Sequence, residues 1–441
     1  MSGISKKFPK GLIVPYAMLL IYTHQVTNRV KYTFNLIFKS VLGIDCELTT
    51  NADSFKQFEG AKISYTKKPV GDELFFQSNN LLFETGIKKE ALTISFPKNE
   101  NDLFVDFFAL AFFLTTRYEE YLPFNGDKYG RFSAKKSLAY KNNFLQKPIV
   151  SIWAKKIQKM ISEHYPNFIF PEKKYSYTPT IDIDNAYAYL GKSFARTLGG
   201  FARAIAKSDW DDFGKRKNVL LKKEKDPYDT YDFQMEIHKK YRLKPVYFLL
   251  MGDWDTNDKN LPHTNQQMQA LIKNISQNAE TGIHPSFASN QYSEKIKIEK
   301  ERLEIIRNSP ITKSRQHFLM LRFPQTYQNL VASGITDDYT MGFADEIGFR
   351  SGTCTPYKWY DLEKEEETNL TLHPFAVMDG TLNNYLKLSP EKAIEKIKLI
   401  VAEIKNVNGE FISIWHNETL GDWRDWKGWK NIYEEMIKLA I

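Results

Sequence analysis

Two aspartates separated by one residue stand at the end of an apolar segment, in the sequence Thr180-Ile-Asp-Ile-Asp184. In an extended strand alternate side chains point to the same face, so the carboxylates of Asp182 and Asp184 would lie side by side. Two like charges this close are unfavourable unless a proton or a cation lies between them. A divalent metal would resolve the conflict, with one carboxylate as its ligand and the other free to accept a proton from a bound water. The alternative is an aspartate pair that stabilises a loop.

Two histidines follow short apolar segments later in the chain and could complete such a site. His284 lies in the sequence Gly-Ile-His-Pro-Ser-Phe, and neutral imidazole is a common ligand of zinc-like ions. His416 follows the apolar sequence Ile-Ser-Ile-Trp, where an imidazole could protonate a leaving amine, and Asn417 and Glu418 could orient it. Either histidine could instead be structural.

Arginines near these positions could support a catalytic carboxylate by fixing its charge and orientation. Arg315 lies two residues before His317, and Arg350 ends the sequence Gly348-Phe-Arg350. Each could equally form an ordinary salt bridge. Other chemistry is not indicated, because the chain has no Gly-x-Ser-x-Gly motif, no P-loop, no complete dinucleotide-binding motif and no cysteine in a nucleophile motif.

The elements that must position these residues alternate between strands and helices after residue 175. Strands are predicted at 177–183, 246–251, just before 284, and at 316–321, 335–339, 348–350, 370–373 and 410–415. Helices are predicted at 230–241, 265–277, 293–308 and 327–332 and after Ser389-Pro390. This alternation favours a (β/α) barrel over a flat doubly wound sheet, and such barrels place their chemistry at the C-terminal ends of the strands.

The first part of the chain shows a different pattern and is predicted to be a small α/β domain. A length of 441 residues exceeds one ordinary core. We expect a strand at 18–22, helices at 30–41, 103–118 and 149–161, and short strands at 73–77, 81–84 and 92–96. The predicted domains are therefore 1–167 and 175–441, joined by a linker at 168–174.

Composition restricts the partners and the compartment. The net charge is +8, but the basic residues are dispersed and no nucleic-acid-binding module is present, so we do not expect nucleic acid as a partner. The two cysteines are far apart in the sequence, which favours a reducing compartment over a disulfide framework. No apolar stretch reaches the roughly 18 residues of a membrane-spanning helix. These features together predict a cytoplasmic protein.

The order of the motifs resembles the polysaccharide deacetylase (carbohydrate esterase family 4) superfamily, and more narrowly a bacterial subgroup with an added N-terminal α/β domain. The resemblance covers most of the chain after about residue 100. Besides the Asp-x-Asp motif, it depends on Arg117-Tyr-Glu-Glu-Tyr121, Gly130-Arg-Phe132, Asp226-Pro-Tyr-Asp-Thr-Tyr231, Gly348-Phe-Arg350 and Trp415-His-Asn417.

The resemblance implies a distorted (β/α) barrel that binds one divalent metal, often zinc, and removes an acetyl group from an N-acetylated sugar of a polysaccharide or glycan precursor. Asp182 would be the general base and Asp184 a metal ligand. His284 matches the first histidine of the family's His-x-x-x-His metal motif, and His416 matches the C-terminal general acid. Arg350 or Arg315 would orient the base.

The sequence departs from the family pattern at three points. Ile183 separates aspartates that are usually adjacent, position 288 is alanine where the second metal-binding histidine is expected, and a long insertion occupies residues 187–226. His317 is the best substitute for the missing ligand, followed by His373. A non-catalytic carbohydrate-binding or glycan-assembly protein that has lost the metal is the alternative, and an amide hydrolase of non-sugar substrates is a third possibility.

Overall fold

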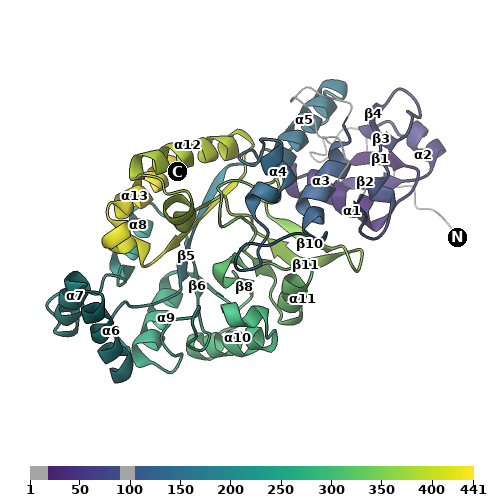
Figure 1. Ribbon diagram of the computed structural model, residues 1–441. Helices are drawn as coiled ribbons and strands as arrows, with labels where there is room; N and C mark the ends of the chain where they lie inside the picture. The colour runs from purple at the N-terminus through teal and green to yellow at the C-terminus, as the bar shows by residue number, and fades with distance from the viewer. Residues whose placement is uncertain (1–17, 90–104) are drawn as a thin grey trace. The chain divides into compact units, whose positions relative to one another are not determined.

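The computed structural model describes residues 18–89 and 105–441, and the chain divides into two compact units (Figure 1). Among the described residues, unit 1 comprises 18–84, 105–110 and 152–173, and unit 2 comprises 85–89, 111–151 and 174–441. The boundary between Lys173 of unit 1 and Lys174 of unit 2 falls within the predicted linker, 168–174. Residues 111–151, which the sequence assigned to the first domain, group with unit 2 instead.

Unit 1 is built on a four-stranded parallel sheet in the order β2-β1-β3-β4. The strands are β1 (Leu19–Thr23), β2 (Cys46–Thr49), β3 (Lys62–Thr66) and β4 (Leu74–Gln77), and the helices between them are α1 (Asn28–Phe34), a π-helix (Asn35–Val41) and α2 (Ala52–Gln57). The rings of Phe34 and Phe108 stack with their centroids 4.5 Å apart and form part of the core of this unit. The strand predicted at 92–96 lies outside the described residues.

Two helices have residues in both units: α3 (Phe107–Thr115) and α5 (Ile149–His164). Each was predicted from its apolar pattern, although the first two residues predicted for α3 lie outside the described part of the chain. The predicted strand at 81–84 is wrong, since Leu81–Phe83 forms one turn of 3-10 helix.

Unit 2 contains a nine-stranded sheet in the order β10-β11-β9-β8-β7-β6-β5-β13-β12. Only the β10–β11 pair is antiparallel. The strands are β5 (Ser176–Ile183), β6 (Val246–Leu249), β7 (Glu280–Ile283), β8 (Lys313–Ser314), β9 (Asp337–Asp338), β10 (Tyr357–Asp361), β11 (Glu366–Leu372), β12 (Val377–Met378) and β13 (Glu410–His416). Because every neighbouring pair from β11 to β12 in this order is parallel, the carboxyl ends of these strands share one edge of the sheet.

The helices of unit 2 alternate with the strands from β5 to β9 and flank β13 in the chain, while one short helix precedes all of these strands. They are α4 (Leu138–Lys141), α6 (Phe194–Ala206), α7 (Trp210–Leu220), α8 (Tyr231–Lys240), α9 (Gln266–Asn278), α10 (Glu294–Arg307), α11 (Gln325–Ala332), α12 (Pro390–Asn406) and α13 (Trp429–Ala440). Helix α12 illustrates why they form: the Ser389 hydroxyl accepts a hydrogen bond from the Lys392 amide, Pro390 occupies the first turn, and the Ala393, Ile397 and Ile404 stripe is buried. Figure 1 shows α6 and α7 side by side, away from the strands.

Two of the predicted strands are wrong. The segment predicted at 316–321 is a turn of 3-10 helix, His317–Leu319, and the strand before it is β8, only two residues long. Residues 348–350 form a turn, in which Gly348 has a φ of +124° and its amide donates to the carbonyl of Ala376. A Cβ at position 348 would lie 2.4 Å from the Leu145 carbonyl oxygen, so glycine permits this close approach.

Among the described residues, no helix is long and apolar enough to span a membrane.

Candidate metal centre

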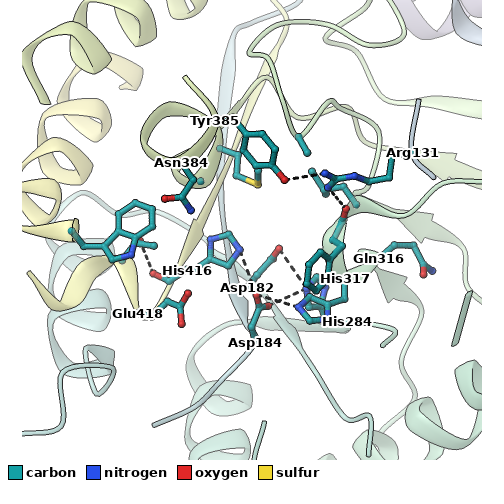
Figure 2. Close-up of a pocket in the computed structure, with 17 residues that line it drawn as sticks. Arg131, Asp182, Asp184, His284, Gln316, His317, Asn384, Tyr385, His416 and Glu418 are labelled. Carbon is teal, nitrogen blue, oxygen red and sulfur yellow. Dashed lines mark hydrogen bonds and ion pairs between the residues drawn. The ribbon is translucent and has the colours of Figure 1, made fainter. Parts of the chain in front are cut away.

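Five of the predicted residues lie together at the carboxyl edge of the unit 2 sheet (Figure 2). Asp182 is the second-last residue of β5, and Asp184 directly follows that strand. His284 directly follows β7. His317 begins the 3-10 helix after β8, and His416 is the last residue of β13. The parallel arrangement of these strands therefore brings together residues that are up to 234 positions apart (416 − 182).

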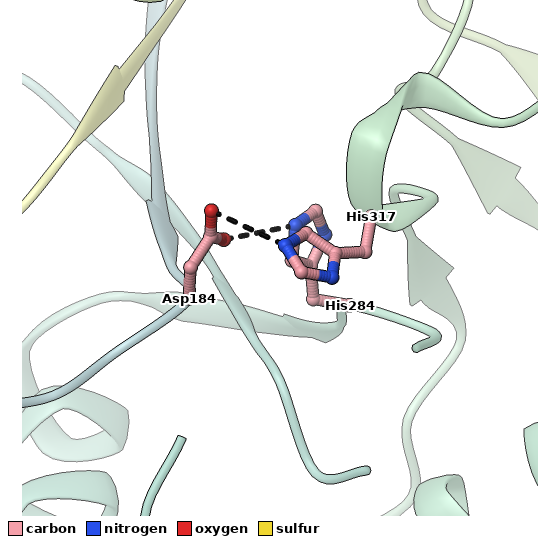
Figure 3. A group of neighbouring side chains, drawn as sticks. All are labelled: Asp184, His284 and His317. Carbon is pink, nitrogen blue, oxygen red and sulfur yellow. Dashed lines mark ion pairs between the residues drawn. The ribbon is translucent and has the colours of Figure 1, made fainter. Parts of the chain in front are cut away.

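Asp184, His284 and His317 form the most compact part of this group (Figure 3). His284 Nε2 lies 3.1 Å from Asp184 Oδ1, and His317 Nε2 lies 3.4 Å from Asp184 Oδ2. One potential ligand atom from each residue falls within 4.8 Å of the other two. The structure thus contains a candidate three-residue metal-binding site.

The imidazole nitrogens that face away from this point are held by oxygen acceptors. His284 Nδ1 lies 2.5 Å from the Arg315 carbonyl oxygen, and His317 Nδ1 lies 2.8 Å from Asp258 Oδ1. A carbonyl or an ionised carboxylate only accepts hydrogen bonds, so each Nδ1 carries the proton and donates it. In the neutral ring this leaves a lone pair on Nε2, which is the arrangement that second-sphere partners impose on metal-binding histidines.

The donor set fits a divalent cation. Asp184 Oδ1 is buried and accepts no hydrogen bond from the described residues, although His284 Nε2 is 3.1 Å away. A buried polar atom without a partner is costly, and a cation between the two groups would compensate both. Two imidazole nitrogens and one carboxylate are the ligand types that Zn²⁺ takes in sites that keep a further coordination position open.

Asp182 has a different environment from Asp184. Arg315 Nη1 donates to Asp182 Oδ1 at 2.7 Å and to the Thr180 hydroxyl at the same distance, and Arg315 Nε donates to the Tyr339 carbonyl at 3.0 Å. Asp182 Oδ2 is 3.9 Å from His284 Nε2. The arginine therefore fixes one carboxylate oxygen and leaves the other facing the metal site.

His416 completes the group on the opposite side of Asp184. Its Nε2 is 3.8 Å from Asp184 Oδ2, while its Nδ1 lies 2.8 Å from Asp379 Oδ1. Asp379 is itself fixed by the His416 amide at 2.9 Å and the Thr419 hydroxyl at 2.6 Å. The carboxylate thus determines how the ring is oriented.

Electrostatics in the metal-free site favour ionised aspartate and protonated imidazole. Burial by itself would raise the pKa of Asp184, but the neighbouring His317 and His284 hold that pKa well below its usual value. Burial would lower the pKa of His317, yet Asp184 and Asp258 raise it to about 9. Burial would also lower the pKa of His416, but the neighbouring carboxylates, Asp379 above all, raise it well above its usual value. Burial and the charge of Asp184 raise the pKa of Glu418 to about 7.

These residues line a cavity of about 310 Å³ whose walls mix polar and aromatic side chains. Arg131 reaches it from the Gly130-Arg-Phe132 motif and is held by Asp127 at 2.8 Å, by the Phe318 carbonyl at 2.7 Å and by the Tyr385 hydroxyl at 2.9 Å. The remaining wall includes Gln316, Asn384 and Trp426. Aromatic and amide groups around a metal site could bind a polar, ring-shaped ligand.

The loop that follows Asp184 is fixed by residues of two further motifs. The carboxylate of Asp226 accepts hydrogen bonds from the amides of Ala188, Tyr189 and Leu190, at 2.8 to 3.1 Å. Asn417 Nδ2 donates to the Asn185 carbonyl at 3.1 Å. These contacts hold the chain that directly follows Asp184.

Arg350 does not join this group. Its guanidinium donates to both carboxylate oxygens of Glu120 and to the Gly342 carbonyl, so all three nitrogens have partners elsewhere. Arg315 is therefore the arginine that contacts Asp182. His373, the second choice for the missing ligand, pairs with Asp337 at 2.8 Å and does not line the cavity.

Sequence analysis missed the two carboxylates that orient the histidines. Asp379 directly follows β12, so its position at a strand end was a usable signal, but that strand is only two residues long and was not predicted. Asp258 lies in a loop nine residues beyond β6, where no strand end or motif marks it. Only the folded chain shows its contact with His317.

Comparison with known proteins gives limited information beyond this geometry. A family of unknown function (DUF7033) matches residues 19–166, about a third of the chain. No curated protein matches.

Among solved structures, the chain is similar to a protein from Mycobacterium smegmatis assigned as a polysaccharide deacetylase, with 15% identity, a TM-score of 0.39 and coverage of 61% of this chain and 85% of the other. It is also similar to a polysaccharide deacetylase from Bacillus cereus, with 10% identity, a TM-score of 0.30 and coverage of 60% and 86%. A mutant of a CE4-family pseudoenzyme matches with 13% identity, a TM-score of 0.28 and coverage of 60% and 63%. At these scores the site's own geometry has to carry any functional argument.

Proposed function

We propose that this protein is a metal-dependent hydrolase that removes an acetyl group from an N-acetylated sugar of a polysaccharide or glycan precursor. The observation that carries the proposal is the meeting of Asp184, His284 and His317 in one cavity with an arginine-held Asp182 and an aspartate-held His416. We further propose that the ion is zinc and that the unit 2 sheet belongs to a distorted (β/α) barrel. The sugar as substrate is the implication of the family resemblance.

Asp184, His284 and His317 would hold the ion. When bound, a divalent cation supplies Lewis acidity, which polarises an acyl carbonyl and makes a water more acidic. Asp182 would take the proton of that water through Oδ2, because Arg315 occupies its other oxygen.

His416 would act on the other side of the scissile bond. As the water oxygen bonds to the acyl carbon and the C–N bond breaks, the imidazolium gives its Nε2 proton to the leaving nitrogen. Asp379 keeps the ring oriented and stabilises its protonated form, as a carboxylate does for the histidine of a hydrolase triad. The products are a free amine on the sugar and acetate.

The direct test is acetate release from a panel of N-acetylated sugars by metal-loaded protein. Asp182→Asn should lower kcat/KM by about 10²–10⁴-fold, the usual contribution of a general base. Asp337→Asn is the matched control, because Asp337 pairs with His373 outside the cavity and its loss should leave the rate unchanged. No acetate from any sugar, with metal bound, would overturn the proposed activity.

Metal content and sugar binding distinguish the hydrolase from the alternative, a non-catalytic carbohydrate-binding protein. The motivation for that alternative is Ala288, which replaces the second histidine of the family motif. It predicts less than one metal per chain and unchanged sugar binding by Asp184→Ala. The hydrolase predicts one metal per chain and its loss in that variant.

A further inference from the structure

A second cavity in unit 2, of about 460 Å³, lies next to the metal-binding loop and is lined by cations. Asn185, the residue after Asp184, is part of its wall. The charged residues that line it are all basic, and no carboxylate takes part: Lys192, Arg196, Arg203, Arg216 and Lys259. We refer to this cavity as the basic groove.

Most of the positive charge in the basic groove is not neutralised by the protein. No carboxylate oxygen of the described residues lies within 4.0 Å of the charged nitrogens of Lys192, Arg203 or Lys259. Arg196 donates only to a backbone carbonyl, that of Lys259, at 3.0 Å. Arg216 alone has an acidic partner, Asp212 at 3.1 Å. Like charges gathered in this way are unfavourable unless an anion joins them.

The electrostatics of Lys192 agree with this description. Burial, and next the charge of Arg196, lower its pKa to about 8. A bound anion would reverse the second of these effects and keep the ammonium group charged.

The sequence of α6 keeps the groove open. Residues 192–208 contain four basic residues and no acidic one, and Gly199 and Gly200 lie in the middle of the helix. Two glycines are unfavourable in a helix, by roughly 1 kcal/mol each. A Cβ at Gly200 would lie 2.4 Å from Arg216 Nη1, and at Gly199 it would project into open space in the groove wall. Both positions therefore leave the groove wall without a side chain.

The chemistry of the wall matches a phosphate group. Guanidinium groups bind phosphate oxygens in pairs, and lysine ammonium groups add point charges. The side chain of Trp254, 62% exposed, forms an aromatic surface in the same wall, with Arg196 5.8 Å from its ring centre. The groove has room for a diphosphate and part of the group attached to it.

We propose that the basic groove binds a phosphate or diphosphate group, and that this group belongs to the molecule whose acetyl group is removed at the metal site. The second half of this statement rests on the proposed function, while the binding of phosphate does not. The substrate would then be a phosphate-linked sugar, anchored by its phosphate beside the loop that carries Asp184.

The phosphate could come from a soluble compound or from a lipid headgroup. Helix α6 exposes large apolar side chains as well as cations, with Phe194, Leu198 and Ile205 exposed by 79%, 51% and 52%. Apolar and basic residues on one helix are the combination that binds anionic lipid surfaces. The experiment therefore has one arm for each source.

In the first arm, calorimetry measures pyrophosphate binding to metal-free protein, so that the metal site cannot contribute. Arg203→Glu and Lys259→Glu should each weaken binding by about tenfold or more, because each replaces an attraction by a repulsion. Lys217→Glu is the matched control: this residue is exposed on α7 and does not line the groove, so its change should leave binding within about twofold. Thermal unfolding of each variant checks that the fold is kept.

In the second arm, the same proteins are sedimented with vesicles of phosphatidylglycerol or of phosphatidylcholine. Binding to the anionic vesicles alone, lost in Arg203→Glu, supports the proposal with a lipid source, and pyrophosphate binding supports a soluble source. Two results would overturn it: no binding of pyrophosphate together with no preference for the anionic vesicles, or equal losses in the control variant. Asp182→Asn should bind pyrophosphate as the native protein does. Phosphate binding can therefore be established even if the proposed hydrolysis is not observed.

Discussion

Two buried groups of charged residues in unit 2 differ in whether their polar atoms are paired. In the first, Arg117 donates to Glu119 at 2.9 Å and to Glu120 at 2.7 Å, and Arg350 donates to both oxygens of Glu120. The remaining oxygen of Glu119 accepts the Leu138 amide at 2.9 Å. In the second, around Asp184, one carboxylate oxygen and the Nη2 of Arg315 have no hydrogen-bond partner among the described residues.

This difference separates a fully paired cluster from a candidate binding site. A buried ion pair whose hydrogen bonds are all satisfied has no free donor or acceptor for a ligand. Buried donors and acceptors without partners can bind an ion or a ligand. Arg315 and Arg350 were both candidates to orient the base, and the sequence motifs alone could not tell them apart. The folded structure assigns Arg350 to the first group and Arg315 to the second.

The largest effect is expected from breaking the paired cluster. Glu120→Gln would leave the buried guanidinium of Arg350 without a carboxylate partner, while Arg117 keeps Glu119. Because a guanidinium cannot lose its proton, the free energy of unfolding should fall by about 3–5 kcal/mol. Chemical denaturation of metal-free protein measures this. Asp184→Asn is the comparison, and it should cost much less, because the imidazoles around it can release their protons. Equal losses in the two variants would contradict the distinction.

A smaller effect is expected from Asp379, the partner of the proposed general acid His416. Asp379→Asn should lower kcat/KM by about 10–100-fold, the usual range for a residue that orients another through a hydrogen bond. It should leave the metal content unchanged, because Asp379 does not contact Asp184, His284 or His317 through any recorded hydrogen bond or ion pair. The alkaline limb of the pH–rate profile should also move to lower pH, because His416 acts in its protonated form and Asp379 is the main group that raises its pKa. Unaltered activity would remove His416 from the mechanism.

The smallest expected effect is the number of protons released when the metal binds. In the metal-free protein the pKa of His317 is about 9, so at pH 7 the ring is protonated and must lose a proton when metal binds. Metal affinity should therefore rise with pH until about pH 9. Calorimetry in buffers of different ionisation enthalpy should detect about one proton released, and fewer for Asp258→Asn, which removes one of the carboxylates that raise this pKa. No buffer dependence would contradict the assignment.

The sequence was informative where a functional residue directly follows a strand. Asp184, His284 and His416 were placed at strand ends by period-2 alternation and apolar runs, and the parallel sheet brings them together. His317 was chosen for its residue type, although the strand predicted around it proved to be a turn of 3-10 helix.

Pairing between distant parts of the chain was beyond the sequence. Arg350 donates a hydrogen bond to Glu120, 230 positions away in the sequence, and His317 pairs with Asp258, 59 positions away. Neither residue spacing nor periodicity predicts these contacts. The insertion was recognised from its length alone. That it forms α6 and α7 and lines a basic groove became visible only in the folded chain.

The central claim is that Asp184, His284 and His317 bind one cation, and elemental analysis of the purified protein tests it most directly. We expect one divalent metal ion per chain in the native protein and in Asp337→Asn, and none in Asp184→Ala. Protein that stays free of metal after dialysis against zinc, or Asp184→Ala that binds as much as the native chain, would contradict the account.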